Sequence, residues 1–353
     1  MIQTKAWAAQ SPTTDLAPWD FERREVGPKD VQFDILYCGV CHSDIHQVAN
    51  DWKNTIYPCV PGHEVVGRVT SIGSNVTKWN VGSIVGVGCM IDSCGQCQSC
   101  KKGDEEFCIG PVAMTMTYNG HFKPDGSEFN TFGGFSTHIV ANQDFVLNIP
   151  EGLNIAAVAP ILCAGVTTYS PLKQRNIKAG DKVGIIGIGG LGHMGVMIAK
   201  AMGAKVVAIT TQEDKRQDAL ALGADEVLIS DDVQAMKNSE LTFDFLLCTI
   251  PQSFDVNPYI ALLAPRGGLV TVGLLGPYKE PTNNMEVAKF ARTVGGSLIG
   301  SIAETQEVLN FCAQHKILPH VEMIGIEAVN EAFDKNKNEE IRFRYVIDMQ
   351  SLK

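Results

Sequence analysis

The chain has 353 residues, of which 45% are hydrophobic and 19% charged, a composition that favours a folded protein of about two domains. Its net charge of −10 argues against a nucleic-acid partner, which would favour a basic surface. Neither an apolar run of about 18 residues nor the apolar core of a signal peptide is evident, so we expect no membrane contact. The 11 cysteines, an odd number, favour a reducing compartment over a disulfide framework. We therefore expect a cytoplasmic protein.

The first part of the chain is predicted to be rich in short β-strands. Residues 31–37 alternate apolar and polar side chains for most of their length, as a half-buried strand does. Residues 65–72, 135–140 and 145–149 also have strand character, and glycines recur through residues 62–88. This pattern indicates a small, strongly curved β-domain.

A mixed group of soft, basic and acidic side chains lies between residues 37 and 64. Thiolate and imidazole can bind zinc, a carboxylate can orient a ligand, and a hydroxyl can move a proton. The group consists of Cys41, His42, Ser43, Asp44, His46, His63 and Glu64. A catalytic zinc takes about three protein ligands. Cys41 and His63 supply two of them, so another part of the chain would have to supply the third.

A second group contains four cysteines at short spacing: Cys94, Cys97, Cys100 and Cys108. Four thiolates at this spacing can close a tetrahedron around zinc with no open position, which defines a structural site. Buried or free thiols and an iron–sulfur cluster are the alternatives. Charged residues between positions 101 and 106 place this group on a surface lobe, and residues 114–134 are expected to form a long loop.

The apolar stretch 155–172 follows, with Cys163 in its middle. A single cysteine in such surroundings is, by itself, most often a small buried core residue.

After this stretch, the predicted elements alternate between strands and helices. Residues 182–186 and 205–209 are predicted strands, and residues 193–202 a helix between them. The intervening turn contains Gly187, Gly189, Gly190, Leu191 and Gly192. Strand, glycine turn, helix and strand form a dinucleotide-binding unit, in which the backbone approaches a pyrophosphate at the helix N-terminus. A plain tight turn is the alternative.

The alternation continues and indicates a doubly wound α/β domain. We expect helices at 214–222 and 257–263, and strands at 226–229, 243–248 and 268–272. Near the end, residues 297–302 and 341–347 are predicted strands and residues 304–315 a helix.

The second strand of the dinucleotide unit predicts the cofactor. An acidic residue at the tip of this strand would bond the ribose 2′-hydroxyl of NAD. Hydroxyls of Thr210 and Thr211 stand there instead, with Lys215 and Arg216 about one helical turn on. A 2′-phosphate prefers hydroxyl and cationic donors, so we expect NADP(H). The alternative is that both cations are solvated helix residues.

Several motifs in one order resemble the zinc-dependent medium-chain alcohol dehydrogenases over essentially the whole chain. The zinc signature is Gly62-His63-Glu64-x2-Gly67-x5-Gly73-x2-Val76, and the four-cysteine lobe and the glycine turn follow at the expected places. Within this family the chain looks closest to the cinnamyl alcohol dehydrogenase-like group, which includes bacterial NADPH-dependent aldehyde reductases. Four stretches carry that likeness, at residues 41–46, 162–165, 189–195 and 304–307. The resemblance implies a GroES-like β-rich catalytic domain, residues 1–150 and 290–353, and a Rossmann NADP-binding domain, residues 151–289.

The resemblance also implies two zinc ions per subunit, one structural and one catalytic. Cys41, His63 and Cys163 would bind the catalytic zinc, which replaces the core reading of Cys163, and Glu64 would lie beside it. Asp44 would orient His63. The proton would pass through Ser43, the ribose hydroxyl and His46.

Further roles follow from matching positions. Thr167 would lie near the nicotinamide, Arg344 would contact the cofactor pyrophosphate, and His42 would reach the cofactor phosphates. Trp52 and Met90 would line a pocket suited to flat aromatic or allylic substrates, or would fill the core.

Together these features predict reversible hydride transfer between NADPH and an aromatic, allylic or aliphatic aldehyde, with the corresponding alcohol as product. The resemblance also implies a homodimer, with the nucleotide domains joined edge to edge. The main alternative is a zinc polyol or secondary-alcohol dehydrogenase that uses NAD. The metal-binding residues argue against a zinc-free quinone reductase. The acidic balance and the second metal set argue against a zinc lobe that binds protein or nucleic acid.

Overall fold

The computed structural model describes residues 1–110, 114–120, 130–273, 276–338 and 343–352. It divides into two compact units, Met1–Cys163 with Gly300–Lys353, and Ala164–Ile299. Both divisions lie later in the chain than the expected boundaries at 150/151 and 289/290. The turn η3 (Ala159–Leu162) packs on strands of the first unit, and β15 (Thr293–Gly296) pairs with β14 (Leu263–Thr271) of the second. These contacts account for the later positions.

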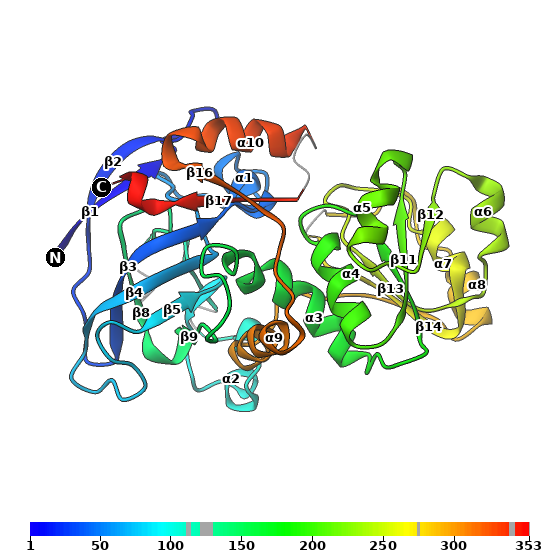
Figure 1. Cartoon of the computed structure of the whole chain (residues 1–353), viewed down its shortest axis with the longest axis horizontal. Helices are drawn as coiled ribbons and strands as arrows, with labels where there is room; N and C mark the ends of the chain where they lie inside the picture. The colour runs from blue at the N-terminus through cyan, green and yellow to red at the C-terminus, as the bar shows by residue number, and fades with distance from the viewer. Residues whose placement is uncertain (111–113, 121–129, 274–275, 339–342, 353) are drawn as a thin grey trace. The chain divides into compact units, whose positions relative to one another are not determined.

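The first unit is built on a seven-stranded sheet (Figure 1). The strand order is β16-β17-β3-β4-β5-β9, and β8 pairs with β3 as a branch. All neighbours are antiparallel except β16 and β17. The bounds are β3 (Asp30–Gly39), β4 (Val65–Ile72), β5 (Ile84–Val87), β8 (His138–Asn142), β9 (Leu147–Asn148), β16 (Val321–Gly325) and β17 (Arg344–Asp348).

Smaller elements complete this unit. Two antiparallel pairs join β1 (Ile2–Ala8) to β2 (Ala17–Arg23) and β6 (Met90–Asp92) to β7 (Thr115–Met116). The helices are α1 (His42–Val48), α2 (Gln98–Lys102), α9 (Ile302–His315) and α10 (Val329–Lys337). Helix α9 begins where the Ser301 hydroxyl accepts the Glu304 amide at 3.2 Å, and it ends before Lys316, which has a left-handed backbone.

Alternation along the strands builds the core of the first unit. In β3, Val31, Phe33 and Ile35 are buried while the residues between them are half-buried. They pack with Val65, Phe135 and other apolar side chains in one cluster. Fully burying such a side chain contributes roughly 1.5–3 kcal/mol, so the sheet is a firm base for residues that extend from its strand ends.

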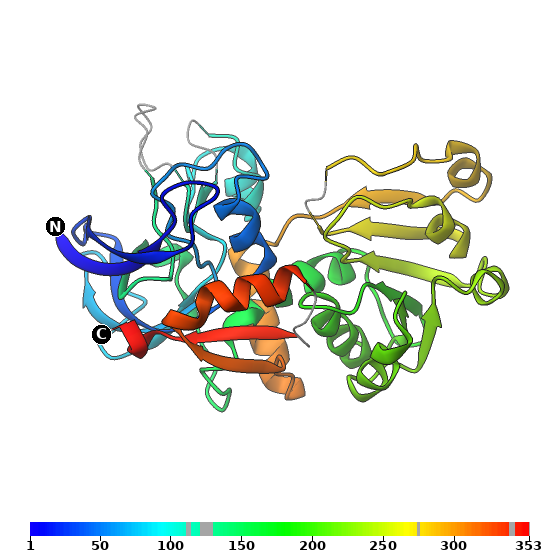
Figure 2. The ribbon, with the colours of Figure 1, turned by 90° about the horizontal axis from the view of Figure 1, so that it is seen from above.

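The second unit is a six-stranded parallel sheet in the order β12-β11-β10-β13-β14-β15, with helices at its sides (Figure 2). Its strands are β10 (Lys182–Ile186), β11 (Lys205–Thr210), β12 (Glu226–Ile229), β13 (Phe243–Cys248), β14 (Leu263–Thr271) and β15. Its helices are α3 (Ala164–Gln174), α4 (Gly192–Ala201), α5 (Arg216–Ala221), α6 (Val233–Asn238), α7 (Asn257–Leu262) and α8 (Asn284–Lys289). The order reverses direction between β10 and β13, and such switch points are where doubly wound sheets bind ligands.

The predicted doubly wound domain is confirmed, and β4, β10, β12 and β13 have the predicted bounds. The strand predicted at 297–302 is wrong. The edge strand lies just before it at β15, whose two glycines hid it, and Ile299 has a positive φ of 42° that breaks an extended run. The apolar stretch 155–172 contains η3 and most of α3.

Two other predictions fall partly outside the described residues. The expected loop 114–134 contains β7 near its start, and its positions 121–129 are not described. The last predicted strand appears as β17, while positions 341–342 are not described. Within the described ranges, no helix has both the length and the apolar character needed to cross a bilayer.

Candidate active site

The first unit places Cys41 at the start of α1. Strand β3 ends at Gly39, and Cys41 takes an extended conformation as the residue before the helix. Its backbone N–H donates to Asp44 Oδ2 at 2.8 Å, which fixes the turn into α1. The Cys41 side chain is buried, with 2% of its surface exposed.

Asp44 connects this turn to His63. Its Oδ1 accepts the Gly62 N–H at 3.0 Å and lies 2.9 Å from His63 Nδ1. The carboxylate is fully buried, so these donors replace the water it would otherwise bind. Burial is the largest single effect and lowers the pKa of His63, but the charges of Asp44 and Cys89 and the hydrogen bonds to Asp44 and Cys41 together outweigh it, so the pKa is raised well above its ordinary value. Because Nδ1 faces Asp44, the opposite nitrogen, Nε2, is presented to the sulfur atoms nearby.

Cys163 reaches His63 from far along the chain. It follows the turn η3, and its Sγ lies 3.3 Å from His63 Nε2. Its contact with Cys41 is the largest cause that holds the pKa of the Cys41 thiol well below its ordinary value.

Ligand atoms of Cys41, His63, Glu64 and Cys163 all lie within 4.8 Å of one another, and all four residues are buried. Two thiols, one imidazole and one carboxylate that converge in this way fit a zinc ion. The structure thus brings together four sequence-predicted residues that span more than a hundred positions.

Glu64 has a neighbour that the sequence did not predict, the buried Arg344. The Arg344 guanidinium forms an ion pair with Glu64 Oε1, while Glu64 Oε2 has no partner among the described residues. A Cβ at Gly39 would lie 1.9 Å from Oε2, so only glycine leaves room for this carboxylate. Burial raises the pKa of Glu64 to about 7, opposed by the charge of Arg344. One carboxylate oxygen of Glu64 therefore makes no hydrogen bond to the described residues, while the carboxyl group itself belongs to the metal-binding cluster.

Two residues beside the cluster were missed from the sequence. The Tyr118 ring meets the His63 ring edge-on, with centroids 5.5 Å apart, and only 4% of Tyr118 is exposed. Burial first, and then the Asp44 charge, raises the pKa of Tyr118 well above its ordinary value. Cys89 is buried, and its contact with Cys163 is the largest cause that lowers the pKa of its thiol. Neither residue stands in a motif, so the sequence carried no signal for them.

Helix α1 carries the remaining polar candidates. His46 Nδ1 lies 2.7 Å from Asp51 Oδ2, and 29% of the His46 side chain is exposed. The His46 ring also lies between His42 and Trp52, with centroids 5.5 and 5.7 Å away. His42, Ser43 and Trp52 are half-buried, whereas Met90 is buried at the start of β6. His46 is thus both tethered and open to solvent.

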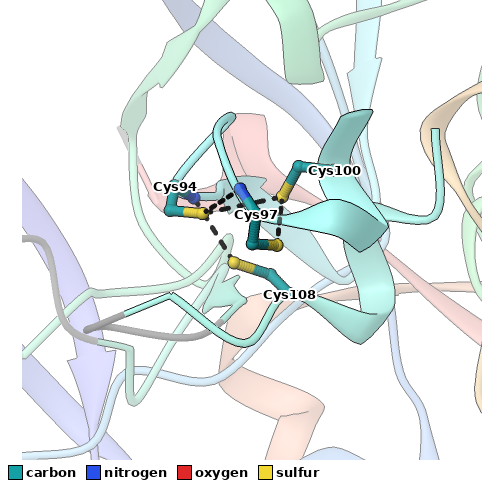
Figure 3. Close-up of side chains that lie close together, drawn as sticks. All are labelled: Cys94, Cys97, Cys100 and Cys108. Carbon is teal, nitrogen blue, oxygen red and sulfur yellow. Dashed lines mark hydrogen bonds between the residues drawn. The ribbon is translucent and has the colours of Figure 1, made fainter. Parts of the chain in front are cut away.

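The four-cysteine lobe is a separate cluster in the same unit. Figure 3 shows the side chains of Cys94, Cys97, Cys100 and Cys108 pointing toward one another. The Sγ–Sγ distances from Cys100 are 3.5 Å to Cys97 and 3.9 Å to Cys94. Thiolates about 2.3 Å from a tetrahedral zinc lie roughly 3.8 Å apart, so the spacing fits this ion.

Backbone amides already favour thiolates in this lobe. The amides of Gln96 and Cys97 donate to Cys94 Sγ at 3.5 and 3.3 Å. A backbone hydrogen bond from Cys100 is the main cause that lowers the pKa of Cys97 to about 6. The described residues contain no further group of this kind.

In the second unit, the glycine turn connects β10 to α4. Gly187 has a φ of 85°, and a Cβ at Gly192 would lie 1.8 Å from the Gly187 carbonyl oxygen, so both positions require glycine. A Cβ at Gly189 would meet nothing within 4 Å, and Gly190 and Leu191 complete the turn. This open backbone before a ten-residue helix fits a bound pyrophosphate.

The candidate 2′-phosphate residues differ in their surroundings. Thr210 ends β11, and its hydroxyl accepts the Gln212 amide at 3.2 Å, while Thr211 is exposed. Arg216 is held by two contacts to the Glu213 carboxylate and donates to the Val227 carbonyl at 3.3 Å. Lys215 is half-buried one position earlier. Separately, the buried Thr167 hydroxyl on α3 has no hydrogen-bond partner among the described atoms.

The fold and the two clusters define a zinc-type dehydrogenase with a β-rich unit and a dinucleotide-type parallel sheet. Family models agree: an alcohol dehydrogenase GroES-like domain matches residues 27–151, and a zinc-binding dehydrogenase domain matches residues 190–314. The chain belongs to the zinc-dependent medium-chain alcohol dehydrogenase family, so it is an oxidoreductase with a GroES-like and a Rossmann domain.

Individual relatives cover the whole chain. The aldehyde reductase YahK of Escherichia coli is 47% identical over 99% of this chain and 99% of its own length. The NADP-dependent alcohol dehydrogenase C 1 of Mycolicibacterium smegmatis is 45% identical over 100% of both chains. A cinnamyl alcohol dehydrogenase from Helicobacter pylori, complexed with NADP(H), superposes with a TM-score of 0.92 at 39% identity over 99% of each chain. The predicted family and subgroup are confirmed.

Proposed function

We propose that this protein is a zinc-dependent, NADPH-dependent aldehyde reductase, which also runs in reverse as an alcohol dehydrogenase. The buried convergence of Cys41, His63, Glu64 and Cys163 is the observation that carries the proposal. An aldehyde reductase and an NADP-dependent alcohol dehydrogenase among the full-length relatives support the same reaction. Aromatic, allylic and aliphatic aldehydes are the proposed substrates, and the cinnamyl alcohol dehydrogenase neighbour favours the aromatic and allylic ones.

We assign two zinc ions to each chain. Cys41, His63 and Cys163 would hold the catalytic ion, with Glu64 as a neighbouring fourth group, and the four cysteines of the lobe would hold the structural ion. When bound, the catalytic zinc supplies a Lewis acid at the carbonyl oxygen and the nicotinamide supplies the hydride. Asp44 keeps His63 in the orientation that its Nε2 needs.

The proton path uses α1. Ser43 donates to the substrate oxygen, and His46 exchanges the proton with solvent. The tether from His46 Nδ1 to Asp51 supports this role because it orients the ring while 29% of the side chain stays exposed. Trp52, packed beside His46, is assigned as a wall for flat substrates, and the buried Met90 is assigned to the same pocket.

NADP(H) is assigned to the second unit, with Thr167 at the nicotinamide and the glycine turn at the pyrophosphate. Thr210, Thr211 and Lys215 bind the 2′-phosphate. Arg216 is assigned a smaller share, because its guanidinium is already engaged by Glu213 and Val227. His42 and Arg344 are kept as cofactor-phosphate contacts of lower weight, since Arg344 is buried against Glu64.

The assembly is proposed to be a homodimer joined through the Rossmann units. Strand β15 ends the parallel sheet order and has one free edge among the described strands, with mostly exposed residues. Light scattering on the purified protein tests this. Thiolate ligands and 11 cysteines without a disulfide support a reducing compartment such as the cytoplasm.

The reaction is tested with the zinc-loaded enzyme and a panel of aldehydes and polyols. We expect kcat/KM with NADPH to exceed that with NADH by at least about tenfold, and aldehydes to outrank polyols. Lys215→Ala should lower this cofactor preference by about tenfold, while the matched variant Arg216→Ala should lower it only about twofold. A preference for NADH, or turnover of polyols alone, would instead favour the NAD-dependent polyol dehydrogenase.

A further inference from the structure

Asp44 contacts several groups of the metal-binding cluster at once. Its fully buried carboxylate accepts backbone N–H groups from Cys41 and Gly62 and also faces His63 Nδ1. It therefore sets the position of one sulfur ligand and one nitrogen ligand at once. Any group that holds this carboxylate in place acts on both ligands.

Tyr118 is such a group. Its ring meets the His63 ring edge-on, with the ring centroids 5.5 Å apart and an interplanar angle of 63°. Burial is the main cause that raises the pKa of the Tyr118 phenol, and the Asp44 charge and a side-chain hydrogen bond to Asp44 raise it further. An aromatic edge-on contact contributes about 0.5–1.5 kcal/mol beyond burial, and a donor to a charged acceptor adds to it.

The residues on both sides of Tyr118 are anchored. The Thr117 hydroxyl donates to the Gly88 carbonyl at 2.5 Å, and the Thr117 amide donates to the Cys89 carbonyl at 3.1 Å. Asn119 has a positive φ of 56°, and its side chain accepts the Ile56 amide at 2.7 Å. The backbone of Tyr118 is thus tied to the segment before Met90 and to the segment after Trp52, so the phenol has little freedom to leave Asp44.

We propose that Tyr118 is a positioning residue of the catalytic zinc site, which holds Asp44 with its hydroxyl and His63 with its ring. The contacts that the structure shows for its side chain are with His63 and Asp44, and we therefore call it a positioning residue. The proposal rests on the proposed zinc site and deepens it. It also gives the chain segment 115–119 a task that its sequence alone did not suggest.

The test is the rate at which a colorimetric chelator removes zinc from the holoenzyme. Wild-type protein should release zinc in two phases, one for each site. The Cys100→Ala variant, which lacks the structural zinc, shows which phase belongs to the catalytic site. Tyr118→Phe keeps the ring and removes only the hydroxyl, so we expect about tenfold faster release from the catalytic site and an unchanged structural phase. Tyr118→Leu, which also loses the ring contact, should release catalytic zinc faster still.

Tyr278→Phe is the matched control. It removes a phenol that hydrogen-bonds Thr271 at 2.9 Å in the Rossmann unit, and both release phases should stay at wild-type rates. If Tyr118→Phe releases catalytic zinc at the wild-type rate, the proposal is overturned. If Tyr118→Phe does not fold, Thr117→Val is tested in its place. This variant keeps the Tyr118 phenol but removes the neighbouring hydroxyl that anchors the backbone. Faster catalytic release in it supports the proposal and unchanged release contradicts it.

The same experiment separates this proposal from the proposed function. Wild-type protein that holds only the structural zinc would overturn the zinc-dependent reaction, and the role of Tyr118 with it. Wild-type protein with two zinc ions and an unaffected Tyr118→Phe variant would overturn the role of Tyr118 alone.

Discussion

The two cysteine clusters of the first unit solve the same coordination problem in different ways. The lobe takes all its sulfur atoms from residues 94–108, and most of them are partly exposed. The other cluster takes its atoms from positions 41 to 163, and every one of them is buried. The first is a local turn closed around its site, whereas the second exists only when the sheet, α1 and η3 are already folded.

Because of this difference, the two clusters are suited to different chemical roles. Four thiolates leave no position open, and backbone amides favour the thiolate form of Cys94 and Cys97, so the lobe is suited to holding a fold together. The buried cluster combines unlike donors with a carboxylate that has one unpartnered oxygen, so it has room for exchange. Supporting residues are also divided unequally, since only the buried cluster depends on Asp44, Arg344 and Tyr118.

The largest effect is expected from Cys163→Ala. Loss of one thiolate should remove the catalytic zinc and lower kcat/KM by about a thousandfold or more, because several kcal/mol of charge stabilisation are lost. Far-UV circular dichroism should stay that of wild type. Cys312→Ala, at a buried thiol on α9 outside both clusters, is the control and should keep activity within about threefold. Substantial turnover by Cys163→Ala would break the assignment.

Cys100→Ala should act on stability instead of chemistry. The lobe would lose its zinc, and we expect the Tm to fall by roughly 10 °C, while kcat/KM per folded molecule changes by less than about threefold. Differential scanning fluorimetry and kinetics on the same preparation measure both. A large loss of kcat at an unchanged Tm would erase the distinction between the two clusters.

Asp44→Asn sharpens the comparison within the buried cluster. The amide has nearly the same shape, but it loses the charge and sets an NH2 group against one of the donors that Asp44 now accepts. We expect catalytic-site zinc affinity to fall about 10–100-fold, measured by chelator competition, with the lobe unaffected. Equal weakening of both sites would point to general unfolding.

The smallest effect is expected from Trp52→Ala. Removing an aromatic wall should lower kcat/KM for cinnamaldehyde-type substrates about fivefold, from the loss of roughly 1 kcal/mol of ring contact, and leave short aliphatic aldehydes near wild type. Steady-state kinetics on both substrate types provides the internal comparison. A uniform loss for all substrates would favour a structural role for Trp52.

The comparison also explains what the sequence could predict. The lobe was visible because its ligands are close together in the chain, and the glycine turn because its conformations demand glycine at Gly187 and Gly192. Cys163 was indistinguishable from a core thiol until its place in a family pattern was considered. The Arg344–Glu64 pair and the Tyr118–His63 contact join positions far apart in sequence, and tertiary contacts of this kind leave no local pattern.

The zinc content per chain tests the central claim most directly. Elemental analysis by mass spectrometry should find two zinc ions in wild-type protein, and one each in Cys163→Ala and Cys100→Ala, with activity lost only in the first. One zinc per wild-type chain, or two in either variant, would contradict the account of one local structural site and one assembled catalytic site.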